Sequence, residues 1–214
     1  MKRTYLFDFD GVILDSEKFH YEAWKHVAGL VSVDFSFSEY VPFQSRGRKA
    51  VISYLLEKAK ISFDEKIFNE LSAEKSAFFA RSTRYVGAEN LIPGVADFIK
   101  KLKSLNFSLG LCSSAVTAND MLLKLGLARY FDVVFDGKKD LPKKPDPAVF
   151  LAASSFFGES PKNCVVFEDS VSGVTSALNG GFNVIGIGEN LSFFEGEFPI
   201  FKDFIGVNDY IFGK

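Results

Sequence analysis

The chain of 214 residues contains 47% hydrophobic and 24% charged residues and carries a formal net charge of −2, values that are ordinary for a globular protein. This charge balance argues against a nucleic-acid-binding protein, which would show a basic patch or a high isoelectric point. The sequence has no apolar run of membrane-spanning length, and Met1-Lys2-Arg3 is not followed by the apolar core of a secretion signal. Cys112 and Cys164 fall in expected buried strands, as small core residues do in a reducing compartment, so we expect a cytoplasmic protein.

The first expected element is a buried strand that ends at two carboxylates. Tyr5-Leu6-Phe7 is an apolar run followed by Asp8 and Asp10, and it predicts a strand buried on both faces, as in a parallel sheet. Open α/β sheets bind ligands at the carboxyl ends of their strands, and neighbouring carboxylates repel unless a cation or a shared proton compensates them. The stretch therefore predicts a metal site or an acid–base pair, with an Asp-capped turn as the structural alternative.

An all-helical block is expected next, because apolar side chains recur at helical spacing and no buried strand is recognisable between residues 17 and 84. Asp15 or Ser16 is suited to cap its first helix. The expected helices of this block are 16–28, 49–58 and 64–81.

From Pro93-Gly94 onward, strands and helices are expected to alternate. This alternation predicts a doubly wound, Rossmann-like parallel sheet with right-handed crossovers, interrupted after its first strand by the helical block. We therefore expect an α/β core formed by residues 1–15 and 86–214 and an inserted helical domain of residues 16–85. Residues 191–214 show too weak a pattern for assignment. The expected strands of this part are 107–112, 133–135, 163–167 and 183–187, and the expected helices are 94–105, 117–127, 147–157 and 171–178.

Polar groups of catalytic type follow several of the expected strands. Asp8 and Asp10 end the first strand, Ser113 ends the second, and Glu168-Asp169 end a later one, while Lys144 precedes a helix start. The carboxyl ends of parallel strands share one edge, so these residues are expected to converge. Carboxylates so placed favour Mg²⁺, and a hydroxyl and a lysine suit an anionic phosphoryl group. Each residue alone has an ordinary alternative as a cap, a surface charge or a turn.

These residues resemble the four motifs of the haloacid dehalogenase superfamily. Asp8-Phe9-Asp10-Gly11-Val12 is similar to the first motif, Ser113 to the second, Lys144 to the third and Glu168-Asp169 to the fourth. The insertion after the first motif resembles the small helical cap of the subfamily that contains β-phosphoglucomutases and sugar-phosphate phosphatases. The stretch His20-Tyr21-Glu22-Ala23-Trp24-Lys25 is similar to the first cap helix of the β-phosphoglucomutases.

The resemblance implies a role for each core residue. Asp8 would attack phosphorus to form an aspartyl-phosphate, and Asp10 would act as the general acid and base. Mg²⁺ would be held by Asp8, the backbone carbonyl of Asp10 and Asp169, with Glu168 as a further or water-mediated ligand. Lys144 and Ser113 would stabilise the transferring group. Gly11 and Ser114 are expected to contact the substrate.

The resemblance also implies that residues of the helical block select the substrate. For His20, packing with an ordinary hydrogen bond is as plausible as contact with Asp10. One of the two arginines near residue 47 would bind the non-reacting phosphate while the other is surface, and Lys75 also fits an ordinary charged helix face. The candidate substrate-binding residues here are His20, Trp24, Arg46, Gly47, Arg48 and Lys75.

Two departures from the β-phosphoglucomutase pattern favour hydrolysis. Ala115-Val116-Thr117 replaces a Ser-Lys-Asn run that helps hold the distal phosphate, and the loop from Ser45 to Arg48 reads Ser-Arg-Gly-Arg instead of Gly-x-Ser-Arg. We therefore expect a monomeric, Mg²⁺-dependent phosphatase of a small sugar phosphate or similar metabolite. The alternative is a β-phosphoglucomutase that interconverts β-glucose 1-phosphate and glucose 6-phosphate. A non-enzymatic binding protein would be expected to have lost one of the motif residues.

Overall fold

The computed structural model describes residues 4–44 and 46–213, so Met1-Lys2-Arg3 and Ser45 of the basic loop lie outside the described residues. The chain forms two compact units: an α/β unit of Met1–Asp15 with Gly87–Lys214, and a helical unit of Ser16–Val86. The segments that leave and re-enter the α/β unit lie side by side. The Asp15 N–H donates to the Asn90 carbonyl at 2.8 Å, and Leu14 forms an antiparallel bridge with Leu91.

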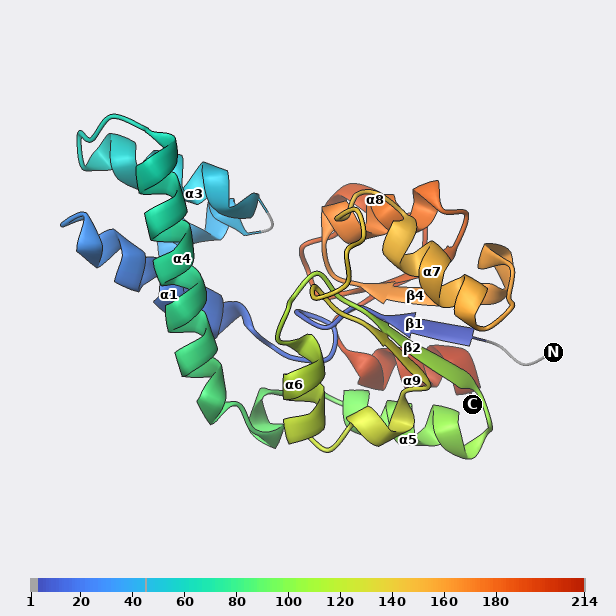
Figure 1. Cartoon of the computed structure of the whole chain (residues 1–214). Helices are drawn as coiled ribbons and strands as arrows, with labels where there is room; N and C mark the ends of the chain where they lie inside the picture. The colour runs from blue at the N-terminus through green and yellow to red at the C-terminus, as the bar shows by residue number, and fades with distance from the viewer. Residues whose placement is uncertain (1–3, 45, 214) are drawn as a thin grey trace. The chain divides into compact units, whose positions relative to one another are not determined.

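The α/β unit is built on a six-stranded parallel sheet with the order β3-β2-β1-β4-β5-β6 (Figure 1). This sheet confirms the predicted doubly wound α/β fold. The first strand lies in the centre, because β1 pairs with β2 on one side and with β4 on the other. The strands are β1 (Thr4–Phe7), β2 (Ser108–Cys112), β3 (Val133–Phe135), β4 (Cys164–Glu168), β5 (Asn183–Ile187) and β6 (Ile200–Phe201).

Helices cover both faces of the sheet, and Figure 1 shows α7 and α8 on one side of it and α5 and α9 on the other. Alternate residues of β1 point to opposite faces, as in any strand. Phe7 therefore packs against Phe98 of α5 and Phe204 of α9, while Leu6 belongs to the cluster that contains Phe150 of α7. The helices are α5 (Val95–Ser104), α6 (Ala118–Lys124), α7 (Ala148–Phe156), α8 (Val171–Asn179) and α9 (Phe204–Phe212).

The helical unit has its own apolar core, which includes Trp24, Phe35 and Leu55. Its longest helix, α4, is capped by the preceding residue, Asp64. The Asp64 carboxylate accepts the N–H groups of Lys66 and Ile67 at 2.6 and 3.1 Å. This is the side-chain capping that aspartate performs at helix starts. The helices are α1 (Glu17–Leu30), α2 (Phe37–Tyr40), α3 (Gly47–Lys58) and α4 (Glu65–Ser82).

The structure differs from the sequence prediction at several element boundaries. Helix α6 ends at Lys124, three residues before the predicted end, because Gly126 with φ +71° lets the Leu127 N–H turn back to the Leu122 carbonyl. The unassigned C-terminal region contains β6 and α9, whose start is capped by Asp203. Among the described residues, every helix is too short or too polar to traverse a bilayer. Short 3₁₀ segments complete the chain at Val41–Phe43, Thr83–Tyr85, Ala88–Asn90, Ala128–Tyr130, Pro161–Asn163 and Ser192–Phe194.

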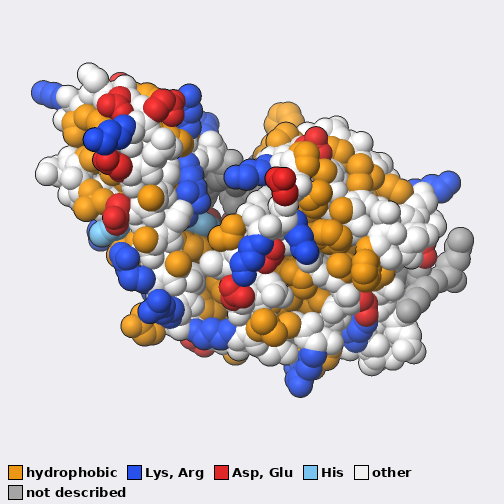
Figure 2. All heavy atoms as spheres, in the orientation of Figure 1, with side chains coloured by type: hydrophobic (Ala, Val, Ile, Leu, Met, Phe, Trp, Pro, Cys, Tyr) orange, Lys and Arg blue, Asp and Glu red, His pale blue; other side chains and the backbone are white. Residues whose placement is uncertain are grey.

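Charged side chains of both signs lie on the drawn face of each unit (Figure 2). On the face drawn in Figure 2, acidic, basic and hydrophobic side chains alternate over short distances within the helical unit and within the α/β unit. The whole chain has near-equal numbers of acidic and basic residues, 27 and 25.

Candidate active site

The predicted site residues of the α/β unit lie at the carboxyl ends of β1, β2 and β4. Phe7 pairs with Phe167 in register, so Asp8, which follows β1, lies next to Glu168, the last residue of β4. The Asp8 N–H donates to the Phe167 carbonyl at 3.0 Å, which extends this pairing beyond the end of the strand. Ser113 follows β2 in the same way. Its N–H donates to the Phe135 carbonyl at 2.8 Å.

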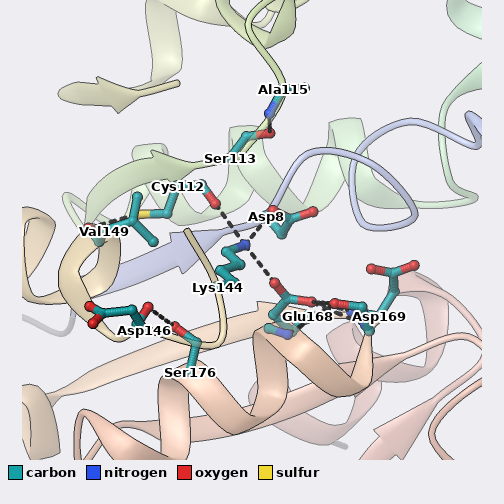
Figure 3. A network of polar contacts seen from close by, with 12 residues as sticks. Asp8, Cys112, Ser113, Ala115, Lys144, Asp146, Val149, Glu168, Asp169 and Ser176 are labelled. Atoms are coloured by element: carbon teal, nitrogen blue, oxygen red, sulfur yellow. Dashed lines mark hydrogen bonds and ion pairs between the residues drawn. The ribbon is translucent and has the colours of Figure 1, made fainter. Parts of the chain in front are cut away.

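Lys144 connects two of these strand ends through its ammonium group (Figure 3). The Nζ atom lies 2.5 Å from Asp8 Oδ1 and 2.6 Å from Glu168 Oε1, and it also donates to the Cys112 carbonyl at 3.0 Å. The Lys144 side chain is 8% exposed, and Nζ lies 4.7 Å from the centre of the Phe150 ring. The ammonium group is therefore a buried cation held by two carboxylates, a carbonyl and an aromatic face.

Burial dominates the ionisation of the acidic groups around Lys144. Burial raises the pKa of Asp8 to about 7, the charge of Lys144 opposes this shift, and the charges of Glu168 and Asp10 add to it. Burial also raises the pKa of Asp169 well above its ordinary value, with further contributions from the neighbouring acidic groups. For Lys144, burial lowers the pKa, but the adjacent Asp8 and Glu168 outweigh burial and raise the pKa above its ordinary value. The site thus favours a protonated lysine and disfavours the ionised forms of Asp8 and Asp169.

Three carboxyl groups form an acidic cluster whose geometry fits a metal ion. Asp8, Glu168 and Asp169 each offer an oxygen atom, and these atoms all lie within 4.8 Å of one another. Hard oxygen ligands of this kind suit Mg²⁺. The raised pKa values of Asp8 and Asp169 are a second sign of fit, because a bound cation would relieve the repulsion that disfavours their ionised forms.

The backbone at the start of α8 fixes Glu168. Oxygen Oε2 accepts the N–H groups of Asp169 and Ser170 at 3.0 and 3.1 Å and the Ser170 hydroxyl at 3.1 Å. The Ser170 Oγ atom in turn accepts the N–H of Gly173 at 3.1 Å, which caps α8. Ser170 was not among the predicted site residues, although a serine between a strand and a helix is a recognised capping signal.

Gly11 lies against Asp169 in the turn that follows β1. Its φ is +74°, a value that side chains disfavour, and a Cβ atom placed there would lie 2.0 Å from Asp169 Oδ2. The carbonyl of Phe9 accepts the N–H groups of Ile13 and Leu14 at 2.9 and 3.0 Å and so closes the turn that carries Gly11. The absence of a side chain at Gly11 thus leaves the space that the Asp169 carboxyl group occupies, while the predicted contact of Gly11 with substrate stays a prediction.

The Ser113-Ser114 segment and Lys144 line the same small cavity. Ser113 is buried, and its Oγ accepts the Ala115 N–H at 3.0 Å. Because Oγ accepts this bond, the hydroxyl proton remains available for donation to a bound anion. Ser113, Ser114 and Lys144 line one small cavity of about 40 Å³ together with Gly137, while Ser114 itself is exposed.

A larger cavity, of about 820 Å³, lies at the opposite end of the sheet. Its lining includes Tyr5, Asn163 and Asn183, which lie at or near the amino ends of β1, β4 and β5. The acidic cluster is not part of this lining. The larger volume of this cavity is therefore no reason to place the catalytic site there.

Within the helical unit, three predicted substrate-binding residues, His20, Trp24 and Lys75, lie together. His20 Nδ1 lies 2.7 Å from Lys75 Nζ, and Lys75 is buried with its Nζ atom 5.5 Å from the Trp24 ring centre. Burial, together with the charges of Lys75 and Arg48, lowers the pKa of His20 to about 3. An ammonium group can only donate, so Nδ1 is the acceptor, and the neutral imidazole carries its proton on Nε2.

Arg46, Gly47 and Arg48, which were predicted to form a basic loop, are exposed, and the structure places Gly47 and Arg48 in the first turn of α3. Arg48 donates to the Ser72 carbonyl at 3.3 Å and to Ser76 Oγ at 2.8 Å, both on α4. Arg46 is exposed at the start of α3, and Gly47 has φ +78° with open space around its Cα. Arg48 is thus held against α4, whereas Arg46 extends from the helix start.

The fold and the site together define a class of protein. It is an α/β enzyme whose parallel sheet brings buried carboxyl groups and a lysine together at the carboxyl ends of its central strands. The chain belongs to the haloacid dehalogenase-like hydrolase family, whose model matches residues 2–181. The family indicated by the four sequence motifs is thereby confirmed.

The relatives of the chain include both phosphatases and phosphomutases. The β-phosphoglucomutase of Bacillus subtilis (strain 168) is 28% identical over 189 residues, covering 87% of this chain and 84% of the relative. A phosphorylated carbohydrates phosphatase of Thermotoga maritima is 30% identical over 183 residues, covering 84% of this chain and 82% of the relative. Among solved structures, the β-phosphoglucomutase from Clostridium difficile matches with a TM-score of 0.78 at 26% identity, over 99% of this chain and 100% of that chain.

Proposed function

We propose that the protein is a Mg²⁺-dependent phosphatase that hydrolyses a small sugar phosphate or similar metabolite through an aspartyl-phosphate on Asp8. The observation that carries this proposal is the buried contact of Lys144 with Asp8 and Glu168, next to Asp169, at the carboxyl ends of β1 and β4. Such an arrangement of carboxylates and one cation suits the transfer of a phosphoryl group, whose negative charge must be offset while a nucleophile attacks.

Asp8 is suited to be the nucleophile because its position is fixed at both ends. Its backbone N–H bonds to the Phe167 carbonyl, and one side-chain oxygen bonds to Lys144. A carboxylate oxygen of Asp8 would attack phosphorus, the bond from phosphorus to the leaving oxygen would break, and the phosphoryl group would remain on Asp8. Water would then attack the same phosphorus atom and regenerate the carboxylate.

Asp10 would move the protons in both steps. It lies two residues after Asp8 on the turn that follows β1, and its charge contributes to the raised pKa of Asp8 and of Asp169. Asp10 would donate its proton to the leaving oxygen and then take a proton from the attacking water. The Lys144 ammonium and the Ser113 hydroxyl would bond to the oxygens of the transferring group.

The acidic cluster would hold Mg²⁺ through Asp8 and Asp169, with the backbone carbonyl of Asp10 and, directly or through water, Glu168. When bound, the ion would neutralise charge on the phosphoryl oxygens and lower the repulsion between Asp8 and the substrate.

We further propose that the helical unit is the cap that selects the substrate. One of the two arginines, Arg46 or Arg48, provides positive charge for an anionic group of the substrate, and His20, Trp24 and Lys75 are the other candidate contacts of this unit. Hydrolysis is favoured over mutase activity because Ala115 and the exposed Val116 cannot hold a second phosphate. We expect the enzyme to act as a cytoplasmic monomer.

Phosphate release from a panel of sugar phosphates, measured with and without Mg²⁺, tests the proposal. We expect turnover that requires Mg²⁺ and that Asp8→Asn abolishes, because an amide cannot form the acyl phosphate. Lys138→Met, a change in an exposed ion pair with Asp120, is the matched control and should retain turnover. Wild-type protein without turnover, or Asp8→Asn protein with turnover, would refute the phosphatase assignment.

A β-phosphoglucomutase is the second candidate, because the chain is similar to such enzymes from two bacteria. The stretch from His20 to Lys25 also resembles the first cap helix of these enzymes. The deciding measurement is conversion of β-glucose 1-phosphate to glucose 6-phosphate after priming with the bisphosphate. Conversion faster than phosphate release would establish the mutase, and release faster than conversion would establish the phosphatase.

A further inference from the structure

Gly173 is a glycine inside a helix where the backbone does not require one. It is the third residue of α8, it is buried, and its φ is not in the positive region that favours glycine. Glycine is less favourable than alanine at such a position because it loses more conformational freedom on folding. A reason for Gly173 must therefore come from its surroundings.

The atoms nearest to a Cβ position at Gly173 belong to the carboxyl group of Glu168. A Cβ atom at position 173 would lie 1.8 Å from Oε1, 2.0 Å from Cδ and 2.3 Å from Oε2 of Glu168. All three distances are far inside van der Waals contact. Glu168 is 1% exposed, so it has no open solvent into which it could move aside. The carboxyl group occupies the space that a side chain at position 173 would fill.

The carboxyl group of Glu168 cannot move without changing other groups of the site. Oε1 accepts a hydrogen bond from Lys144, and Oε2 accepts from the N–H of Asp169 and from the N–H and hydroxyl of Ser170. These four bonds hold both oxygens of the carboxyl group in place. Lys144 also bonds to Asp8, and Asp169 belongs to the acidic cluster. A displaced Glu168 would therefore shift both the ammonium group and the oxygens offered to a metal ion.

We propose that Gly173 is a positioning residue for phosphoryl transfer, because its missing side chain leaves the space in which the Glu168 carboxyl group holds Lys144 against Asp8 beside the metal-binding oxygens. This role rests on the function proposed above. Gly173 itself contacts no reacting atom and acts through Glu168. Gly11 has a similar relation to Asp169, because the absence of a side chain at position 11 leaves space for the Asp169 carboxyl group.

The test compares Gly173→Ala with Gly29→Ala. Gly29 is also a helical glycine, in α1, but a Cβ atom there would meet nothing within 4 Å. We expect Gly173→Ala to lower kcat by roughly a hundredfold with a smaller change in KM, as a displacement of about 1 Å does in active sites. We expect the Mg²⁺ affinity, measured by titration calorimetry, to fall by about 10- to 100-fold, as it does when residues that orient metal ligands are changed. Gly29→Ala should change neither quantity.

A second substitution separates the steric effect from a general structural one. Glu168→Asp shortens the side chain by one methylene group and withdraws the carboxyl group from position 173. On its own it should weaken Mg²⁺ binding, whereas in the Gly173→Ala background it should restore part of the lost affinity. This reversal of sign is the mark of direct contact between the two positions. If Gly173→Ala fails to fold, the double variant must fold, or the proposal is wrong.

The outcomes distinguish this proposal from the proposed function. Wild-type protein that binds Mg²⁺ but hydrolyses no sugar phosphate would overturn the function, while the calorimetric comparison would still decide the role of Gly173. Gly173→Ala protein with wild-type kcat and wild-type Mg²⁺ affinity would overturn the positioning role alone. Wild-type protein that binds no Mg²⁺ would overturn both.

Discussion

Replacing Lys144 by methionine tests the buried charge network directly. The substitution keeps an unbranched side chain to pack on Phe150, but it removes the ammonium group that lies 2.5 Å from Asp8 Oδ1 and 2.6 Å from Glu168 Oε1. Removing one partner of a buried ion pair costs about 3–5 kcal/mol, because the remaining charge stays buried without compensation. For a chain of this size the loss corresponds to a fall in Tm of roughly 6 to 20 °C.

The loss should depend on pH, and its sign follows from the carboxyl groups. Burial raises the pKa of Asp8 to about 7 even though Lys144 opposes the shift, so removing Lys144 raises this pKa further. A folded-state pKa above the unfolded value favours the folded state at low pH and disfavours it as pH rises through the folded-state pKa. Lys144→Met should therefore destabilise the metal-free protein most above about pH 7 and least near about pH 5.

Urea unfolding of the metal-free protein at several pH values measures the effect. Lys138→Met is the control, because Lys138 and Asp120 form an ion pair of 3.0 Å whose side chains are 54% and 64% exposed. Exposed pairs contribute about 1 kcal/mol or less. Mg²⁺ should stabilise Lys144→Met more than the wild type, because it supplies the missing positive charge. A variant as stable as the wild type at alkaline pH without metal would refute the reasoning, as would a loss that grows as pH falls.

Other predictions concern the metal site and the helical unit. Gly11→Ala should weaken Mg²⁺ binding in calorimetry, because its Cβ would lie 2.0 Å from Asp169 Oδ2 at a φ of +74°, and unchanged affinity would contradict this. Mg²⁺ affinity should rise with pH through the region around pH 7, because the pKa of Asp8 is raised to about 7 and its proton must leave when the ion binds. Identical binding heats, measured by calorimetry in buffers of different ionisation enthalpy, would argue against this proton release. His20 should stay neutral down to about pH 5, because burial and nearby Lys75 lower its pKa to about 3. An NMR signal assigned to the His20 imidazole that titrates above about pH 5 would show this to be wrong.

The sequence alone indicated the edge of the sheet at which the site forms. Asp8, Ser113 and Glu168 each follow or end an apolar run, and parallel strands place such ends together. This reasoning needs only hydrophobic periodicity and one topological rule, so it succeeded for the central strands. It did not extend to β6, which is two residues long, because so short a strand leaves no period to detect. Helix α2 was also missed, although Ser36 and Glu39 form a capping box that marks its start.

Tertiary structure alone decided how the residues at this edge contact one another. Lys144 lies on a loop with no strand or helix pattern to direct it, and its place between Asp8 and Glu168 depends on burial and charge, which are properties of the assembled fold. The role proposed for Gly173 could not be predicted from the sequence either, because a glycine in a helix becomes informative only when the group that occupies its Cβ position is known. The sequence by itself determined which chemical groups the protein has and at which end of the sheet they meet. Only the assembled fold decided the distances between these groups, because Asp8, Lys144 and Glu168 are far apart in the sequence and meet through tertiary packing.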